Sequence, residues 1–149
     1  MTMTTIYKTK NFVLETHERP EIDRLEGGHI TISPKKQVKD RTELTPKQAT
    51  ELMRLTVISG IAMKKAMKKI GVNIGRINYQ ENGNWNPHLH IHLYCRSKNA
   101  RMQKYGDPII PGHKKQYKSL NKEDVKRIRK EIEKLLKLKK FSEKSWGLC

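Results

Sequence analysis

Hydrophobic and polar residues alternate in two short stretches near the start of the chain. Asn11–Glu18 opens with an apolar run, and His29–Ser33 places its two isoleucines on one side of an extended backbone. The polar segment 19–28 between them ends in two glycines and predicts a loop. Pro34 limits the second stretch as a central strand. We therefore expect two strands joined by a loop.

A period of three to four residues replaces this alternation after residue 44. Thr45 is a suitable N-cap, Pro46 takes the first helical position, and Gln48 completes a capping box. Gly71 marks the end of the pattern. The apolar residues at helical spacing are expected to form the buried face: Ala49, Leu52, Met53, Val57, Ile61 and Met67. The pattern predicts one long amphipathic helix whose lysines stay in solvent.

Alternation returns after the helix, in two stretches that a turn separates. Both Gly71–Gln80 and Asn84–Arg96 alternate, and Gly83 in the intervening "ENGN" can take a positive φ. These signals predict a β-hairpin.

The last third of the chain predicts one more helix. Residues 97–120 show no clean period. Asn121 is then a suitable N-cap, with Glu123 and Asp124 in the first turn. An apolar stripe follows at helical spacing: Val125, Ile128, Ile132, Leu135 and Leu136. We expect a basic amphipathic helix here.

These elements together predict an α+β fold. It consists of a mostly antiparallel β-sheet, one long helix packed on that sheet, and a C-terminal basic helix. The chain has 149 residues, so we expect a single domain over residues 1–149, in which residues 97–149 are a loop plus the last helix.

Composition indicates which kinds of partner this domain is expected to bind. The 32 Lys and Arg residues against 15 Asp and Glu give a net charge of +17, which favours a polyanion such as a nucleotide or nucleic acid. A general lysine bias on solvated faces would explain the same excess. Two cysteines form no disulfide framework, and neither a signal sequence nor a membrane-spanning run is apparent. We expect a cytoplasmic protein without a membrane partner.

The second strand of the predicted hairpin carries the candidate chemistry. Three of the six histidines, His88, His90 and His92, occupy alternate positions, so in a strand their side chains share one face. We refer to these three residues as the histidine row. The apolar residues between them, Leu89, Ile91 and Leu93, would face the core.

Three interpretations of the histidine row are open. It is a solvent-facing strand surface, a zinc site completed by His113 or Cys95, or a nucleophilic centre. Zinc is disfavoured because the outer two imidazoles of such a row lie roughly 13 Å apart. A neutral imidazole is a competent nucleophile near pH 7, and its neighbours can meet charge on phosphate oxygens and on a leaving group. We favour attack on phosphorus.

Several segments quoted from the chain point to one family. "HLHIHLY" fits the pattern His-φ-His-φ-His-φ-φ, where φ is hydrophobic. "GGHITISPKKQ" is similar to a Gly-His strand followed by proline and basic residues, "ELTPKQATEL" to a helix start and "GRINYQENG" to a penultimate strand. From His29 to Arg96 the chain thus resembles the histidine-triad (HIT) superfamily of nucleotide hydrolases and transferases.

The resemblance implies a role for each histidine. His90 would attack the α-phosphate and become a nucleotidyl-histidine that water hydrolyses. His92 would contact the phosphate and the leaving group, while His88 would support His90. His29 would be the fourth, distant histidine of the family. The substrate-binding positions that we expect are Gln80, Asn84, Trp85 and Arg96.

The sequence departs from the family just before the triad. Where the family commonly has Gly-Gln-Ser/Thr-Val, this chain has Asn84 at the glutamine position and Trp85 at the hydroxyl position. The hydroxyl donor is therefore in doubt, and Trp85 either stacks on a base or packs at the rim. His17 stands near the position where the family often holds the ribose with Asn or Asp.

The resemblance implies a nucleotide substrate, and the positive charge favours a dinucleoside polyphosphate of the Ap4A type. The alternatives are a nucleoside phosphoramidase, a nucleic-acid-binding 5′-adenylate hydrolase, and a non-catalytic nucleotide-binding module. We expect no required cofactor and no dedicated metal site, with a divalent cation such as Mg²⁺ arriving on the substrate. Nucleic acid on the basic surface and a homodimer, common in the family, are the other partners to consider.

Overall fold

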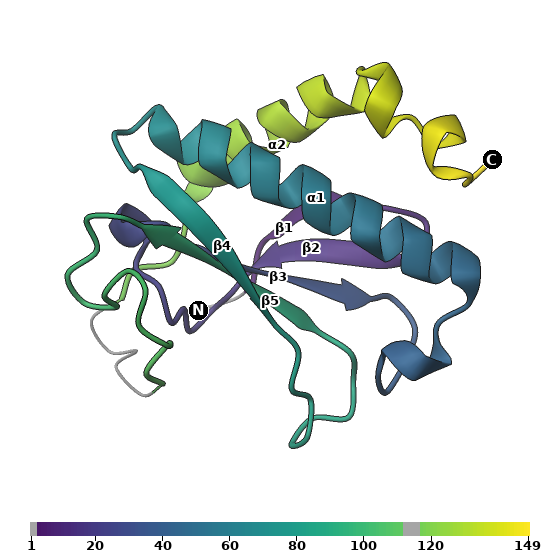
Figure 1. Cartoon of the computed structure of the whole chain (residues 1–149), viewed down its shortest axis with the longest axis horizontal. Coiled ribbons are helices and arrows are strands. Elements are labelled where there is room, and N and C mark those ends of the chain that lie inside the picture. The colour runs from purple at the N-terminus through teal and green to yellow at the C-terminus, as the bar shows by residue number, and fades with distance from the viewer. Residues whose placement is uncertain (1–2, 112–116) are drawn as a thin grey trace.

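A five-stranded antiparallel sheet carries both long helices on one of its faces (Figure 1). The structure is a computed structural model and describes residues 3–111 and 117–149. The strands are β1 (Thr5–Lys8), β2 (Phe12–Thr16), β3 (His29–Pro34), β4 (Ile74–Gln80) and β5 (Ile91–Ser97), in the spatial order β1-β2-β3-β5-β4. The helices are α1 (Pro46–Lys68) and α2 (Lys122–Leu136). The predicted α+β class is confirmed.

Short 3₁₀ helices lie in two of the connecting segments and in the segment that follows α2. They are η1 (Arg24–Glu26), η2 (Arg41–Glu43), η4 (Lys139–Phe141) and η5 (Lys144–Trp146). Within the described residues, neither α1 nor α2 combines the length and the apolar character that a bilayer crossing requires.

Two strand boundaries differ from the sequence-based expectation. The edge strand β1, which pairs with β2, was not predicted because its four residues are too few for a clear alternation. The strand β5 begins at Ile91, so His88 and His90 precede it. The pairing of β3 with β5 ends at Ile32 and Ile91, and Pro34, which lies opposite Leu89, has no N–H to donate to the ladder. The Leu89 N–H bonds the Val38 carbonyl of the next loop instead, at 2.6 Å.

The ends of α1 agree with the prediction, but its buried face does not. Thr45 and Gln48 form the expected capping box. Met53, however, is 56% exposed, and Val57 and Ile61 are only partly buried. The fully buried apolar positions include Leu55, Ile58, Ala62, Met63 and Ala66. The helix contacts β4 and β5 on one side and α2 on another, so its buried arc is wide and rotated from the predicted stripe.

The helix α2 follows the predicted pattern. Asn121 caps it in a box with Asp124, and Val125, Ile128, Ile132 and Leu135 are buried. The Arg24 guanidinium donates two hydrogen bonds to Asp124, at 2.6 and 2.8 Å, and so joins η1 to the start of α2. The side chain of Asp124 is fully buried. This ion pair connects two segments 100 residues apart.

Asp124→Asn is expected to destabilise the fold by about 2 kcal/mol near pH 7. Burial alone would raise the pKa of the Asp124 carboxyl, but hydrogen bonds from Arg24 and Asn121 outweigh it and hold the pKa below its usual value of 3.8. The stabilisation is therefore present above pH 3.8 and is lost as the pH falls through the lower, folded-state pKa.

Urea unfolding of wild type and variant between pH 2 and pH 7 measures this dependence. The difference between them should shrink at the acid end, where the wild-type carboxyl is protonated as well. The exposed Glu133→Gln on the same helix is the control and should change little. A difference that stays constant down to pH 2 would contradict the assignment.

Candidate functional site

The sheet face opposite the helices gathers the polar residues of three strands. On β5 this face continues from His92 through Tyr94 to Arg96, because every second residue projects to the same side. Register places Thr31 of β3 and Gln80 of β4 beside His92. In the next row, His29 and Asn78 flank Tyr94. We call this surface the polar face.

The backbone orients the middle histidine of the row. The Nδ1 atom of His90 lies 2.8 Å from the carbonyl oxygen of His88. Because a carbonyl only accepts hydrogen bonds, Nδ1 carries the proton and Nε2 of the neutral ring keeps its lone pair. The carbonyl thus leaves His90 with a nucleophilic Nε2.

A second set of hydrogen bonds places the proton of His92 on the other ring nitrogen than in His90. The Glu21 backbone N–H donates to Nδ1 of His29 at 3.0 Å, so a neutral His29 carries its proton on Nε2. That Nε2 lies 2.8 Å from Nδ1 of His92, which must then accept. Neutral His92 is left with a proton on Nε2. On this face His90 therefore presents a lone pair at Nε2, and His92 presents an N–H donor at Nε2.

The ring of Tyr94 packs against the ring of His92. The two rings are parallel within 3°, with centroids 5.4 Å apart, and Tyr94 also contacts His29 at 4.6 Å. Burial, followed by the nearby Glu21, raises the pKa of Tyr94 to about 12. The tyrosine is therefore a neutral packing surface near pH 7.

His17 is a fifth histidine of this cluster, although it was not assigned to the site from the sequence. The ring of His17 stacks on that of His29, with centroids 4.3 Å apart and planes within 6°. His17 follows β2, and its N–H bonds the His29 carbonyl at 3.3 Å. The available signal was the prediction of two strands joined by a loop, since antiparallel pairing of such strands brings the end of one beside the start of the other.

The predicted substrate-binding residues fall in three places. Gln80 is exposed and lies beside His92. Asn84 and Trp85 are exposed in the loop that leads into the histidine row, and Trp85 is 100% exposed. Arg96 lies at the far end of the polar face, where it is buried and bonds Asn78. Register thus brings Gln80 to His92 and places Arg96 two rows away.

The imidazole cluster also has the composition of a metal site. Ligand nitrogens of His17, His29 and His92 lie within 4.8 Å of one another. Both ring nitrogens of His29 are already hydrogen bonded, however, and its Nε2 carries the proton. A metal at that nitrogen would force a proton onto Nδ1, against the Glu21 N–H. A metal ion at this cluster would therefore require His29 to give up the hydrogen bond to His92 and to move its proton.

Of the other two candidate ligands, Cys95 does not point toward this cluster. Cys95 lies in the hydrophobic core, on the side of β5 opposite Tyr94, and burial raises the pKa of its thiol to about 12. A thiol with that pKa is protonated near pH 7. His113 lies outside the described residues.

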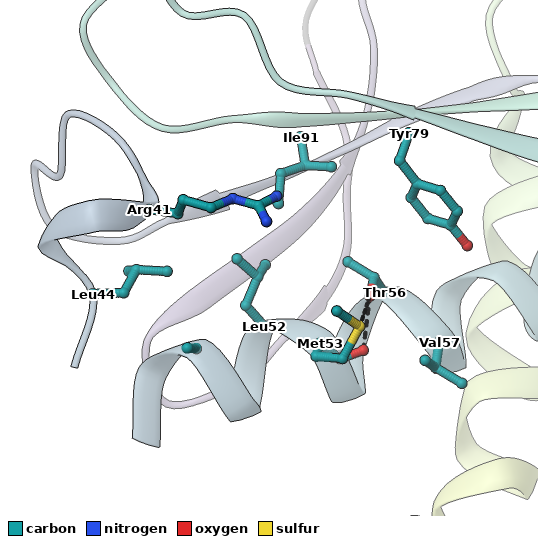
Figure 2. Close-up of a pocket in the computed structure, with 9 residues that line it drawn as sticks. Arg41, Leu44, Leu52, Met53, Thr56, Val57, Tyr79 and Ile91 are labelled. Atoms are coloured by element: carbon teal, nitrogen blue, oxygen red, sulfur yellow. Dashed lines mark hydrogen bonds between the residues drawn. The ribbon is translucent and has the colours of Figure 1, made fainter. Parts of the chain in front are cut away.

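An apolar cavity of about 440 Å³ opens on the helix side of the sheet (Figure 2). Met53, Val57 and Tyr79 are among its lining residues, with Arg41 at its edge. Ile91 also lines it, and Ile91 alternates with His90 and His92. The strand β5 therefore separates this cavity from the histidine row, and the chemistry belongs to the other face.

Fold and site together define a domain that presents His92 on the helix-free face of an antiparallel sheet, with His88 and His90 in the segment that leads into β5. The HIT domain family model matches residues 1–99, about two thirds of the chain. The chain therefore belongs to the HIT domain family. A comparison with curated proteins gives no match.

Solved structures of histidine triad proteins have the same fold. A hypothetical histidine triad nucleotide-binding protein from Sulfolobus tokodaii is 23% identical, with a TM-score of 0.63 over 91% of this chain and 87% of that one. A histidine triad protein from Bradyrhizobium japonicum is 16% identical, with a TM-score of 0.65 over 89% of each chain. A zinc-bound family member from Mycobacterium smegmatis is 20% identical, with a TM-score of 0.57 over 91% of this chain and 87% of that one.

Proposed function

We propose that this HIT domain protein is a nucleotide hydrolase that cleaves a dinucleoside polyphosphate at its α-phosphate. The hydrogen bond between His90 Nδ1 and the His88 carbonyl carries the proposal, because it makes Nε2 of His90 the atom that attacks. Proteins with this domain are commonly nucleotide hydrolases or transferases, which agrees with such a step.

In the first step, the lone pair of His90 Nε2 forms a bond to the α-phosphorus. The bond from phosphorus to the leaving oxygen breaks, and its electron pair leaves with the polyphosphate. The nucleotidyl-imidazole keeps its Nδ1–H on the His88 carbonyl, whose dipole stabilises the positive charge of the ring. The Nε2–H of His92 donates a hydrogen bond to the oxygens on which charge develops.

In the second step, water attacks the same phosphorus and the phosphorus–nitrogen bond breaks. His90 recovers its lone pair, the nucleoside monophosphate leaves, and the proton of the water goes to solvent. Mg²⁺ enters this proposal only with the polyphosphate, whose charge it would reduce.

The protonation of His92 favours a phosphoanhydride over a phosphoramidate. An amine leaving group must be protonated as it departs, and neutral His92 could supply that proton only by becoming an imidazolate. A polyphosphate leaves as a stable anion and needs only a hydrogen-bond donor. The net charge of +17 would also attract the more anionic substrate.

A 5′-adenylated nucleic acid is the second candidate substrate. The observation in its favour is Trp85, a fully exposed aromatic residue in the loop before the histidine row. Stacking of bases on such side chains is a common means of holding single strands. The attacked phosphate and the role of His90 would be the same.

Incubation with diadenosine tetraphosphate, followed by product analysis and intact-mass spectrometry after an acid-free quench, tests the proposal. We expect AMP and ATP as products and an adenylyl adduct on the protein that maps to His90. Asn86→Ala, in the exposed loop, is the control and should still form the adduct. Nucleotide binding without turnover of this substrate, of adenosine phosphoramidate or of adenylated DNA would instead indicate a non-catalytic binding module.

A further inference from the structure

The polar face continues past the histidines into a second pocket. This pocket has a volume of about 230 Å³, and Arg76, Asn78, Arg96, Tyr105, Gly106 and Asp107 line it. Asn78 is the cross-strand neighbour of Tyr94, which stacks on His92. Between the histidine row and the pocket Tyr94 is buried, and the accessible connection runs along β4 through Gln80, Asn78 and Arg76.

Two arginines face one another directly in this pocket. Arg76 of β4 and Arg96 of β5 are cross-strand partners, so their side chains leave the sheet on the same face. Like charges at directly opposed positions destabilise a strand pair. An anion between the two guanidinium groups would turn this repulsion into attraction.

Arg96 is a buried cation whose hydrogen bonds go to uncharged groups. Only 3% of its surface is exposed, and it donates to the Asn78 side chain and to the carbonyls of Lys104 and Asp107. Its Nε is buried without a hydrogen-bond partner among the residues that the structure describes. Burial lowers the pKa of Arg96, and the nearby charge of Asp107 offsets part of this shift.

The charge of the pocket remains positive after its one carboxylate is considered. Asp107 is exposed, and in residues 3–111 and 117–149 neither arginine forms an ion pair with it. The pocket contains two positively charged guanidinium groups and one negatively charged carboxylate. Planar guanidinium groups bind phosphate through two parallel hydrogen bonds, and Arg76 is exposed and free to do so.

We propose that this pocket binds a second phosphate of the substrate, held between Arg76 and Arg96. The inference rests on the proposed function, which places the attacked phosphate at His90. Arg96 follows His92 by four residues, about 13 Å along the strand, so the second phosphate is well separated from the attacked one. The four phosphates of a tetraphosphate chain span less than this distance, so the second phosphate belongs to the backbone of an attached oligonucleotide, the second candidate substrate.

Arg76→Ala tests the pocket through a comparison of long and short substrates. We would measure kcat/KM for the p-nitrophenyl ester of AMP, which has no second phosphate and whose leaving group departs as an anion, for diadenosine tetraphosphate and for a 5′-adenylated trinucleotide. In the variant, the ratio of the trinucleotide to the short ester should fall about five- to tenfold, and the ratio for diadenosine tetraphosphate should change little. Arg101→Ala removes an exposed arginine outside the pocket and should leave the ratios unchanged.

A fall for the trinucleotide but not for diadenosine tetraphosphate supports the pocket, because only the oligonucleotide reaches it. A fall for diadenosine tetraphosphate would show that Arg76 acts close to His90, and unchanged ratios would show that it binds no phosphate of these substrates. Either of these results overturns the pocket.

Binding of inorganic tripolyphosphate, measured by calorimetry at several salt concentrations, separates this proposal from the catalytic one. Arg76→Ala should weaken binding by a similar factor and reduce the salt dependence by about one ion, whereas Arg101→Ala should not. If no substrate is hydrolysed but Arg76→Ala still weakens tripolyphosphate binding, the catalytic proposal fails and the pocket stands. If hydrolysis occurs and Arg76→Ala binds tripolyphosphate like wild type, the pocket is wrong.

Discussion

His90→Ala is expected to lower kcat for diadenosine tetraphosphate on the order of 10⁴-fold or more, because it removes the only covalent step available to the site. The substrate affinity should change little, since the charged and polar groups around the phosphate remain. Single-turnover kinetics for the rate and calorimetry for the affinity measure the two quantities separately.

The matched variant is His88→Ala. The group that orients His90 is the backbone carbonyl of residue 88, which alanine retains. We therefore expect a loss of about tenfold or less, far smaller than that of His90→Ala. In a His90→Gly variant, added imidazole should partly restore cleavage at the α-phosphate. The small nucleophile can occupy the space of the missing ring. Equal losses in His88→Ala and His90→Ala would show that Nε2 of His90 has no special role.

Gly27→Ala is expected to destabilise the protein by at least about 3 kcal/mol. Gly27 has a φ of +132°, and an added Cβ would lie 1.7 Å from the Cys95 carbonyl oxygen. That carbonyl belongs to the backbone of β5 and cannot move without the strand. The neighbouring Gly28 carbonyl accepts the Cys95 N–H at 3.0 Å, so the loop and the strand are joined at this point.

Gly71→Ala is the control for Gly27→Ala. Gly71 also has a positive φ, of +83°, but an added Cβ there would meet nothing within 4 Å. Its cost should be that of backbone conformation alone, about 1 kcal/mol. Chemical denaturation compares the two. If both variants lose the same free energy, the close approach between Gly27 and Cys95 contributes nothing.

The sequence predicted the elements whose signals are local. The capping boxes at Thr45 and Asn121, the stripe of α2 and the hairpin of β4 and β5 each depend on residues close together in the chain. The stripe of α1 was wrong because two neighbours bury the helix, and a periodic pattern does not say from which sides they approach. The start of β5 was wrong because it depends on where another strand ends.

The candidate site was likewise predictable only in its local features. The spacing of His88, His90 and His92 is visible in the sequence, whereas the protonation of their rings depends on partners that no pattern indicates. The Glu21 N–H reaches His29 only because the intervening loop turns back over it. The pairing of Arg76 with Arg96 requires the register of β4 on β5, which a bulge between Ile74 and Arg76 shifts.

The hydrogen bond between His29 and His92 also affects how the chain folds. It spans 63 residues, and all of α1 lies inside the loop that it closes. Closing a loop of that length costs about 4 kcal/mol of chain entropy before any contact repays it. The helix can form early from local signals, but the histidines meet only when β3 and β5 pair. A chain synthesised only as far as the end of α1 would therefore be partly helical without the assembled histidine cluster, and formation of the contact between His29 and His92 would report the last stage of folding.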